Sequence, residues 1–174
     1  MSEIVNKIQQ SKLKTVDLEK FLIGESFQEL DVKQFLFKEM ILKEDYFREE
    51  LNQHDWIQYK DKWLAVYCST DAIIPSWAWM LIVTYAGEYA KDVIFGTEPD
   101  AKMAAIQHKA DQHDWSVYKN KFVLLKGCSK MEVPPAAFLE ATKKLIPFAD
   151  KLMYGEACSN VPVYRKTKKN NAAT

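Results

Sequence analysis

One ten-residue segment occurs twice in this chain, and this repeat constrains the fold more than any other feature of the sequence. The segment HDWIQYKDKW at 54–63 returns 59 residues later as HDWSVYKNKF at 113–122. The same offset separates Pro75 from Pro134 and Gly96 from Gly155, and Cys68 and Cys128 follow at an offset of 60. Because these anchors recur in the same order, residues 54–96 and 113–155 are interpreted as two copies of one unit.

Each copy has the pattern strand, helix, strand. The short apolar runs at 63–67 and 122–125 are typical of buried strands, and 93–95 and 152–154 are expected to form the second strands. A proline follows each first strand at a position that suits the first turn of a helix. The helix after Pro75 is apolar on nearly every side, so we expect burial on several faces, whereas its counterpart after Pro134 is amphipathic. Such βαβ units give parallel strands.

The fold class expected from this pattern is α/β, with three layers and a mainly parallel sheet built from the two duplicated βαβ units. A helix that begins after Thr97 joins the copies, with Asp100 placed to complete a capping box. Residues 1–53 are expected to add a small N-terminal α+β extension, with a helix near 3–10, a strand or two around 17–30 and a helix over 44–53. The prediction is one domain over 1–164, followed by a flexible basic tail at 165–174.

The charge balance argues against a nucleic-acid partner, since the 24 basic and 24 acidic residues cancel. No apolar run approaches the roughly 20 residues that a membrane-spanning helix needs, so no membrane association is expected. The N-terminus lacks the basic start and apolar stretch of a secretory signal, and the chain has an odd number of cysteines, three. Both features favour the reducing cytoplasm.

All three cysteines follow predicted strands. Cys68 comes directly after the first strand, Cys128 after the third and Cys158 after the last, and each is followed by a serine. In one parallel sheet these positions share the carboxyl edge, where open α/β folds bind their ligands. Three thiolates at one edge would form a soft site for zinc, iron or an iron–sulfur cluster. The alternative is that the three side chains are buried and inert, as small hydrophobic groups.

A fourth ligand is less clearly marked. Asp71 is the best candidate, with a helix N-cap as its alternative role, and Glu132 and Glu156 are weaker candidates. His54 and His113 precede the strands, so they are expected at the opposite edge. We predict that both histidines occupy equivalent places at the ends of helical segments and bind no metal, and that the HDWxxY motif is structural.

Three functions remain open from the residues alone. The first is a metal- or iron–sulfur-binding protein that uses Cys68, Cys128 and Cys158. The second is a thiol enzyme or persulfide carrier that uses one cysteine as nucleophile. The third is an interaction module whose cysteines are inert. The glycines form no phosphate-binding loop and no CxxC pair occurs, so no catalytic residue is assigned.

The repeated stretches also resemble a bacterial family known as domain of unknown function 2480. The resemblance rests on HDWIQYKDKWLAVYCSTDAIIPSWAWML, VIFG, KGCSKMEVP and MYGEACSNVPVYRK, with DVKQFLFKEMILKEDYFREEL upstream, and it covers nearly the whole chain. It implies a soluble cytoplasmic protein. Because genes of this family lie near iron–sulfur cluster assembly genes of the SUF type, the resemblance also implies protein partners in cluster assembly.

Overall fold

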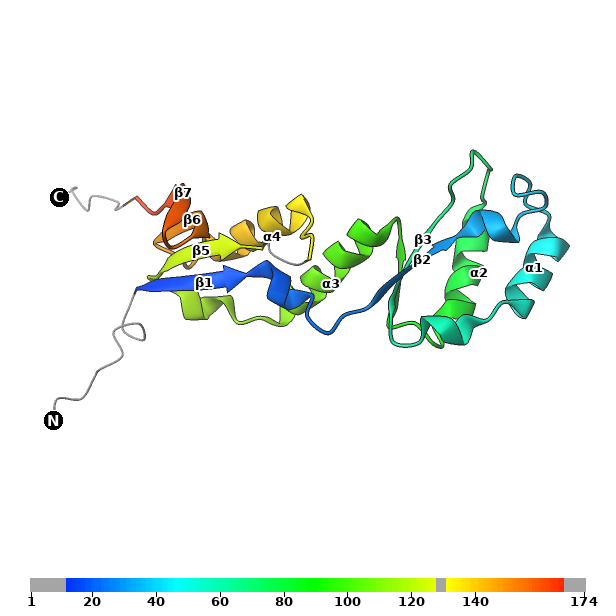
Figure 1. The fold of residues 1–174 in the computed structure, drawn as a ribbon, viewed down its shortest axis with the longest axis horizontal. Coiled ribbons are helices and arrows are strands. Elements are labelled where there is room, and N and C mark those ends of the chain that lie inside the picture. Colours follow the sequence, from blue (N-terminus) through cyan, green and yellow to red (C-terminus); the bar gives the residue numbers. More distant parts are fainter. Residues whose placement is uncertain (1–11, 128–130, 168–174) are drawn as a thin grey trace, which may run out of the picture. The chain divides into compact units, whose positions relative to one another are not determined.

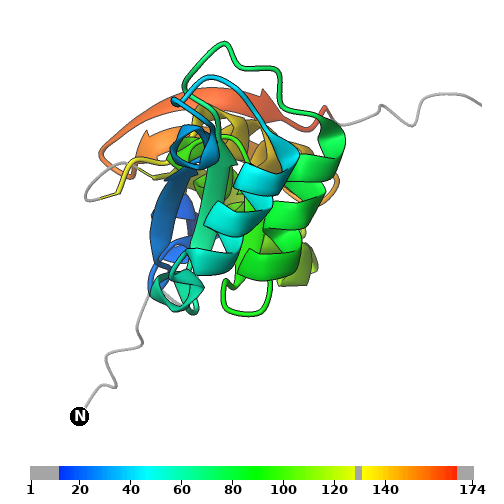
Figure 2. The ribbon, with the colours of Figure 1, turned by 90° about the vertical axis from the view of Figure 1, so that its right-hand side faces the viewer.

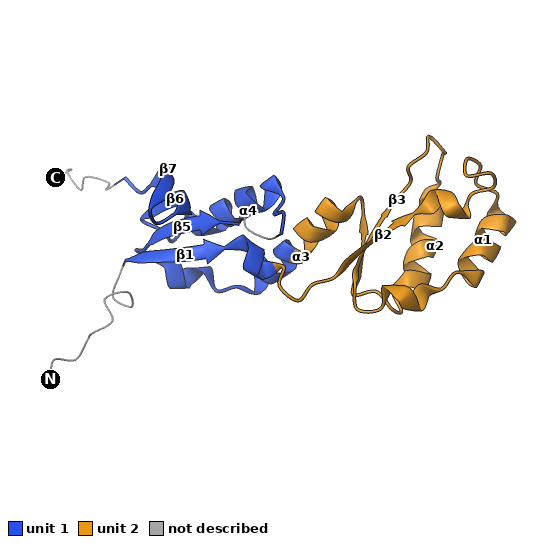
Figure 3. Ribbon diagram, viewed as in Figure 1, with its two compact units in different colours: residues 1–21, 106–174 blue, residues 22–105 orange. Residues whose placement is uncertain are grey.

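The chain folds into two compact units. The computed structural model describes residues 12–127 and 131–167. Unit 1 takes residues 1–21 and 106–174, whereas unit 2 is the continuous segment 22–105 (Figure 3). Unit 2 is therefore inserted into the sequence of unit 1 after the first strand. No helix in the described ranges is long and apolar enough to cross a membrane.

Unit 2 contains a sheet of three parallel strands in the order β2-β3-β4 (Figure 1). These strands are β2 (Phe27–Asp31), β3 (Trp63–Tyr67) and β4 (Asp92–Phe95). Helices α1 (Glu44–Gln53) and α2 (Ser76–Ala86) lie side by side (Figure 2). They are joined by an edge-to-face contact between the Phe47 and Trp77 rings, whose centroids are 5.9 Å apart.

Unit 1 repeats this order and adds one strand. Its sheet has the order β1-β5-β6-β7, in which β1 (Leu13–Asp17), β5 (Phe122–Lys126) and β6 (Lys151–Glu156) are parallel. The last strand, β7 (Ser159–Arg165), returns antiparallel to β6 through a tight turn. Helix α4 (Pro135–Leu145) connects β5 to β6. The sequence analysis did not predict β7.

Helix α3 (Glu98–Gln112) begins in unit 2 and ends in unit 1. Its start is capped as the sequence predicted, since the Thr97 backbone N–H donates to Asp100 Oδ2 over 2.8 Å. Gly96, just before this cap, has φ of 129°, and a Cβ at that position would collide with the Asp100 carboxylate. A glycine is therefore required for the capping contact.

The predicted α/β class and the mostly parallel strands are confirmed, but the prediction of one shared sheet is wrong. Residues 63–67 and 122–126 lie in different sheets. The physical reason is that each of these strands already has two neighbours: β3 lies between β2 and β4, and β5 lies between β1 and β6. The segment predicted as an N-terminal extension supplies β1 to one sheet and β2 to the other.

The predicted helix at 44–53 is confirmed as α1, and β2 lies in the range around 17–30 where a strand or two were expected, whereas β1 ends where that range begins. The helix predicted near 3–10 lies outside the described residues. So does most of the predicted flexible tail, from residue 168 onward, while β7 continues to Arg165.

The expectation that α2 would be buried on several faces holds only in part. Ala78, Ile82 and Ala86 are fully buried, and the flanking residues Trp77, Trp79, Leu81 and Tyr85 pack partly buried against the same core. Met80 and Val83, by contrast, are at least half exposed. The three fully buried residues recur at every fourth position, so they form one face against the sheet. Nothing among the described residues encloses the opposite face.

The predicted places of the two histidines are confirmed. His54 is the C-cap of α1, and His113 follows the end of α3. The Nε2 atom of each histidine hydrogen-bonds to a tyrosine hydroxyl five residues on, Tyr59 at 2.8 Å and Tyr118 at 3.1 Å. Their lack of a bound metal stays a prediction.

The tryptophans of the HDWxxY segments have the structural role that the sequence predicted. Trp56 and Trp115 are buried, and each indole N–H donates over 2.7 Å to a backbone carbonyl five residues earlier, in α1 and α3 respectively. Each motif therefore fastens the 3-10 helix that it contains, Trp56–Tyr59 or Trp115–Tyr118, to the end of the preceding α-helix.

Candidate functional site

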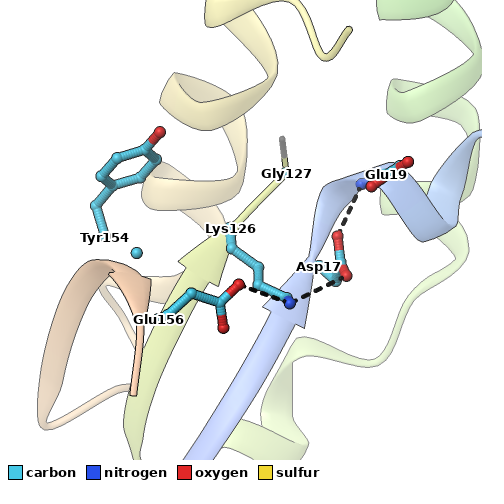
Figure 4. Close-up of a pocket in the computed structure, with 7 residues that line it drawn as sticks. Asp17, Glu19, Lys126, Gly127, Tyr154 and Glu156 are labelled. Carbon is cyan, nitrogen blue, oxygen red and sulfur yellow. Dashed lines mark hydrogen bonds and ion pairs between the residues drawn. The ribbon is translucent and has the colours of Figure 1, made fainter. Parts of the chain in front are cut away.

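A pocket of about 170 Å³ opens at the carboxyl edge of the sheet in unit 1 (Figure 4). Open α/β proteins bind ligands at this edge because strand ends and loops leave backbone and polar groups exposed there. Five of its seven lining residues have polar or charged side chains, and the lining consists of Asp17, Glu19, Lys126, Gly127, Tyr154, Gly155 and Glu156.

Three parallel strands place these residues together. Asp17 is the last residue of β1 and Lys126 is the last residue of β5, and the two are register partners. Tyr154 and Glu156 lie near the end of β6, the other neighbour of β5. Because the strands run in the same direction, their last residues meet at one edge.

Lys126 is the centre of the charged network in the pocket. Figure 4 shows its side chain reaching between two carboxylates, with Nζ 2.9 Å from Glu156 Oε1 and 3.8 Å from Asp17 Oδ2. The hydrogen bond to Glu156 raises the pKa of Lys126, and the charges of Glu156, Asp17 and Glu19 raise it further. The amine is therefore a fixed positive charge at neutral pH and not a nucleophile.

The two acidic residues at the end of β1 also order the neighbouring backbone. Asp17 Oδ1 accepts a hydrogen bond from the Glu19 N–H at 3.2 Å. Glu19 Oε1 accepts one from the Met131 N–H at 3.0 Å. Glu19 thereby ties the first 3-10 helix, residues 18–21, to the chain just after residues 128–130.

The matching edge of unit 2 lacks this network. Asp31 ends β2, but its Oδ1 accepts hydrogen bonds from the Lys33 and Ser69 backbones, both at 3.1 Å. Burial raises the pKa of the Asp31 carboxyl, but its hydrogen bonds to Ser69 and Lys33 lower it, and the net shift of the pKa is downward. Tyr67 ends β3 and Phe95 ends β4. At the strand end where unit 1 has Lys126, unit 2 thus has Tyr67, and Asp31 binds the backbone of the following loop and not a lysine from the next strand.

The structure separates two of the predicted thiol ligands into different units. Cys68 follows β3 in unit 2, is half-buried and lies 3.4 Å from the Thr70 hydroxyl. Cys158 is exposed in the turn between β6 and β7 of unit 1. Cys128 lies outside the described residues. The argument that one sheet edge unites all three cysteines is therefore wrong, because β3 and β6 belong to different sheets.

No three histidine, cysteine or acidic side chains gather into a metal-binding group within residues 12–127 and 131–167. Asp71 is exposed in unit 2 and does not cap α2, whose N-cap is Pro75. Of the two weaker candidates, Glu156 pairs with Lys126, and Glu132 is exposed.

Lys126, Asp17, Glu19 and Tyr154 were not singled out from the sequence. One signal could have revealed part of this set: LKTVDLEKF at 13–21 resembles FQELDVKQF at 27–35, and both are strands that end in aspartate. The sequence alone does not pair 13–17 with 122–126, however, since more than 100 residues separate them.

Comparison with known proteins places nearly the whole chain in one family model. Residues 2–166 match the model described as protein of unknown function (DUF2480). No curated protein and no solved structure matches the chain.

Proposed function

Because the chain belongs to the DUF2480 family, whose description names no activity, we propose a function from the site itself. We propose that the carboxyl edge of unit 1 binds a thiophilic metal, as zinc, iron or an iron–sulfur cluster, with Cys128 and Cys158 as its thiolate ligands. The protein would then serve as an accessory of iron–sulfur cluster assembly and act with protein partners of that process in the cytoplasm.

One observation carries this proposal: the chain segments that lead to the two cysteines start side by side. Strands β5 and β6 are paired, and the Lys126–Glu156 contact of 2.9 Å joins their ends. Cys128 follows Lys126 by two residues, and Cys158 follows Glu156 by two residues. Two residues span at most about 7 Å of extended chain, so both cysteines can reach the same charged pocket.

The charges at this edge suit a thiolate–metal site. A divalent metal held by two thiolates and one carboxylate has a net charge of −1, which the ammonium of Lys126 would offset. Glu156 is two residues from Cys158 in the chain, and its side chain is exposed enough to exchange its lysine contact for a metal.

This proposal narrows the ligand set that the sequence predicted. Cys68 and Asp71 belong to unit 2, so the argument from neighbouring strand ends does not extend to them.

We also infer that the two units are copies of one βαβ design. Both hold an edge-to-face aromatic pair between helix and second strand, Trp79–Phe95 in unit 2 and Phe138–Tyr154 in unit 1. The charged edge is then a specialisation of one copy.

The test is metal retention in single variants of the full chain. Protein prepared without air is analysed for zinc and iron, and for the sulfur-to-iron absorption of a cluster. We expect Cys128→Ser and Cys158→Ser each to lower metal content at least about tenfold, as expected for loss of one thiolate ligand. Cys68→Ser, a matched control in the other unit, should retain the wild-type content.

Two outcomes would contradict this proposal. Equal metal loss in Cys68→Ser and Cys158→Ser would favour the three-cysteine site that the sequence predicted. Asp71→Asn would then be the next variant to test. Absence of metal from wild-type protein, before and after anaerobic incubation with Zn²⁺ or Fe²⁺, would remove metal binding altogether.

A thiol enzyme or persulfide carrier is the second candidate, and the exposure of Cys158 favours it. A carrier needs an accessible thiolate, and Cys158 lies in a surface turn whereas Cys68 is half-buried. Mass spectrometry after brief alkylation distinguishes the two candidates. A carrier requires rapid labelling of one cysteine in metal-free protein and a trapped persulfide on it after sulfur loading, which a metal-only site does not.

A further inference from the structure

Unit 2 exposes an apolar surface on and beside α2. Phe95 at the end of β4 is 73% exposed, Met80 is 69% exposed and Val83 is 50% exposed. Trp79 links the strand to the helix, because its ring meets Phe95 edge to face at 5.0 Å. Met80 and Val83 are three residues apart on the helix and share its outer side. We call these four residues the α2 face.

The α2 face is free of charge along the whole helix. The eleven residues of α2, SWAWMLIVTYA, include no acidic or basic side chain. Surface helices of globular proteins normally carry charged residues opposite their buried side. Here the buried side is Ala78, Ile82 and Ala86, and the opposite side is formed by Met80, Val83 and small uncharged residues.

Helix α4 of unit 1 shows that this fold does not require an uncharged helix. Counted from the prolines that precede the helices, Leu139 stands at the place of Met80 and Lys143 at the place of Thr84. Lys143 Nζ donates to Glu140 at 2.6 Å on the surface of α4. An equivalent helix in the same chain therefore has a solvated, charged outer side, and the uncharged side of α2 calls for a partner.

We propose that the α2 face binds the α2 face of a second copy of this chain across a two-fold axis. A charged partner would bury its charges against a surface that offers no counter-charge, which is costly. An identical copy offers an uncharged, apolar surface that meets this requirement. Two-fold homodimers are the most common protein assemblies, and their interfaces are the most apolar class. Aromatic and methionine side chains such as Phe95 and Met80 are enriched there.

The test measures the mass of the full chain in solution over a range of concentrations, by sedimentation velocity and light scattering. Wild-type protein should form a dimer that dissociates on dilution. The double variant Met80→Glu/Val83→Glu places two negative charges in each copy of the interface, and it should raise the dissociation constant at least about 100-fold. Its matched control is Leu139→Glu/Thr142→Glu at the corresponding places of α4, which should dimerise like wild type.

Circular dichroism and thermal unfolding show whether each variant is folded. Because the changed side chains are on the surface, a folded monomeric α2 variant beside a dimeric α4 variant supports the proposal. A wild-type chain that stays monomeric at about 100 μM overturns it, since this leaves the face to another protein or to another part of the same chain. A dimer that persists in a folded Met80→Glu/Val83→Glu variant also overturns it. This interface does not involve the cysteines, so its failure leaves the metal proposal intact.

Discussion

At the scale of single residues, the histidine–tyrosine and tryptophan–carbonyl contacts explain why the HDWxxY segment occurs twice. In unit 2 the His54 ring packs edge to face on Phe35 and Trp56, with centroids 5.0 and 4.8 Å away, while its Nε2 meets the Tyr59 hydroxyl. His54 Nε2, the Tyr59 hydroxyl and the Trp56 indole N–H thus each have a hydrogen-bond partner beside an aromatic cluster. Such satisfied polar groups fix one conformation of the chain, because a misplaced one would lose its hydrogen bond in an apolar setting.

Acidification should destabilise unit 2 through His54. Burial lowers the pKa of His54 below its ordinary value of about 6.5, so the folded protein holds the neutral ring while the unfolded chain takes up a proton more readily. This stability is present above about pH 6.5 and is lost as the pH falls through the folded pKa. Urea unfolding from pH 7.5 to 5.5 should therefore show a fall in stability that is smaller in His54→Gln. An unchanged pH dependence in that variant would contradict this account.

At the scale of elements, the turn between β6 and β7 positions the exposed thiol and one carboxylate of the candidate site. Gly155 has φ of 116°, and a Cβ there would lie 2.6 Å from the Ser159 carbonyl oxygen on the facing strand. Only glycine allows this close approach in that conformation. The glycine at 155 therefore permits the hairpin that turns Cys158 and Glu156 toward the edge of the sheet.

We predict that Gly155→Ala destabilises this hairpin by about 1–3 kcal/mol, the usual cost of a strained backbone position. Hydrogen exchange should become faster along 151–165 but not in unit 2, and metal retention, where present, should fall. Gly24→Ala separates backbone strain from collision: its φ of 81° is also strained for alanine, but a Cβ there would meet nothing within 4 Å, and exchange along 151–165 should stay at the wild-type rate. A hairpin that keeps wild-type exchange rates in Gly155→Ala would show that the chain relieves the collision without cost.

At the scale of the whole molecule, the insertion of unit 2 into unit 1 decides which parts of the chain can fold alone. The three strands and two helices of unit 2 come from one continuous segment, and its core includes Phe35, Leu64 and Ile82. Unit 1 instead takes β1 from the beginning of the chain and its other strands from the end. Without β1, the β5 strand would lose one of its two neighbours, and the buried side chains of Val16 and Leu18 would be missing from the core.

Separate fragments should therefore behave differently. Residues 22–112, which include all of α3, are expected to unfold in one cooperative thermal transition, because they contain a complete sheet and core. Residues 106–174 should lack such a transition and regain it when a peptide of residues 1–21 is added. Calorimetry and amide NMR spectra check both expectations. Cooperative folding of 106–174 alone would show that β1 is dispensable.

The local structure of this protein follows from its amino-acid sequence. The apolar runs at 63–67 and 122–125, the helix at 44–53 and the Thr97–Asp100 cap were all predictable, because each depends on residues close together in the chain. The repeat also indicated that both copies would use the same contacts, as the histidine–tyrosine and tryptophan–carbonyl pairs do.

Long-range contacts, in contrast, select which strands share a sheet and hence which side chains share a site. Nothing local distinguishes a β3 strand that pairs with β5 from one that pairs with β2, since parallel pairing depends on contacts far apart in the sequence. The strands at 13–17 and 27–31 each completed a separate sheet, which assigned Cys68 and Cys158 to different units. The same pairing brought Asp17 beside Lys126, and so formed a charged pocket whose residues lie at distant places in the chain.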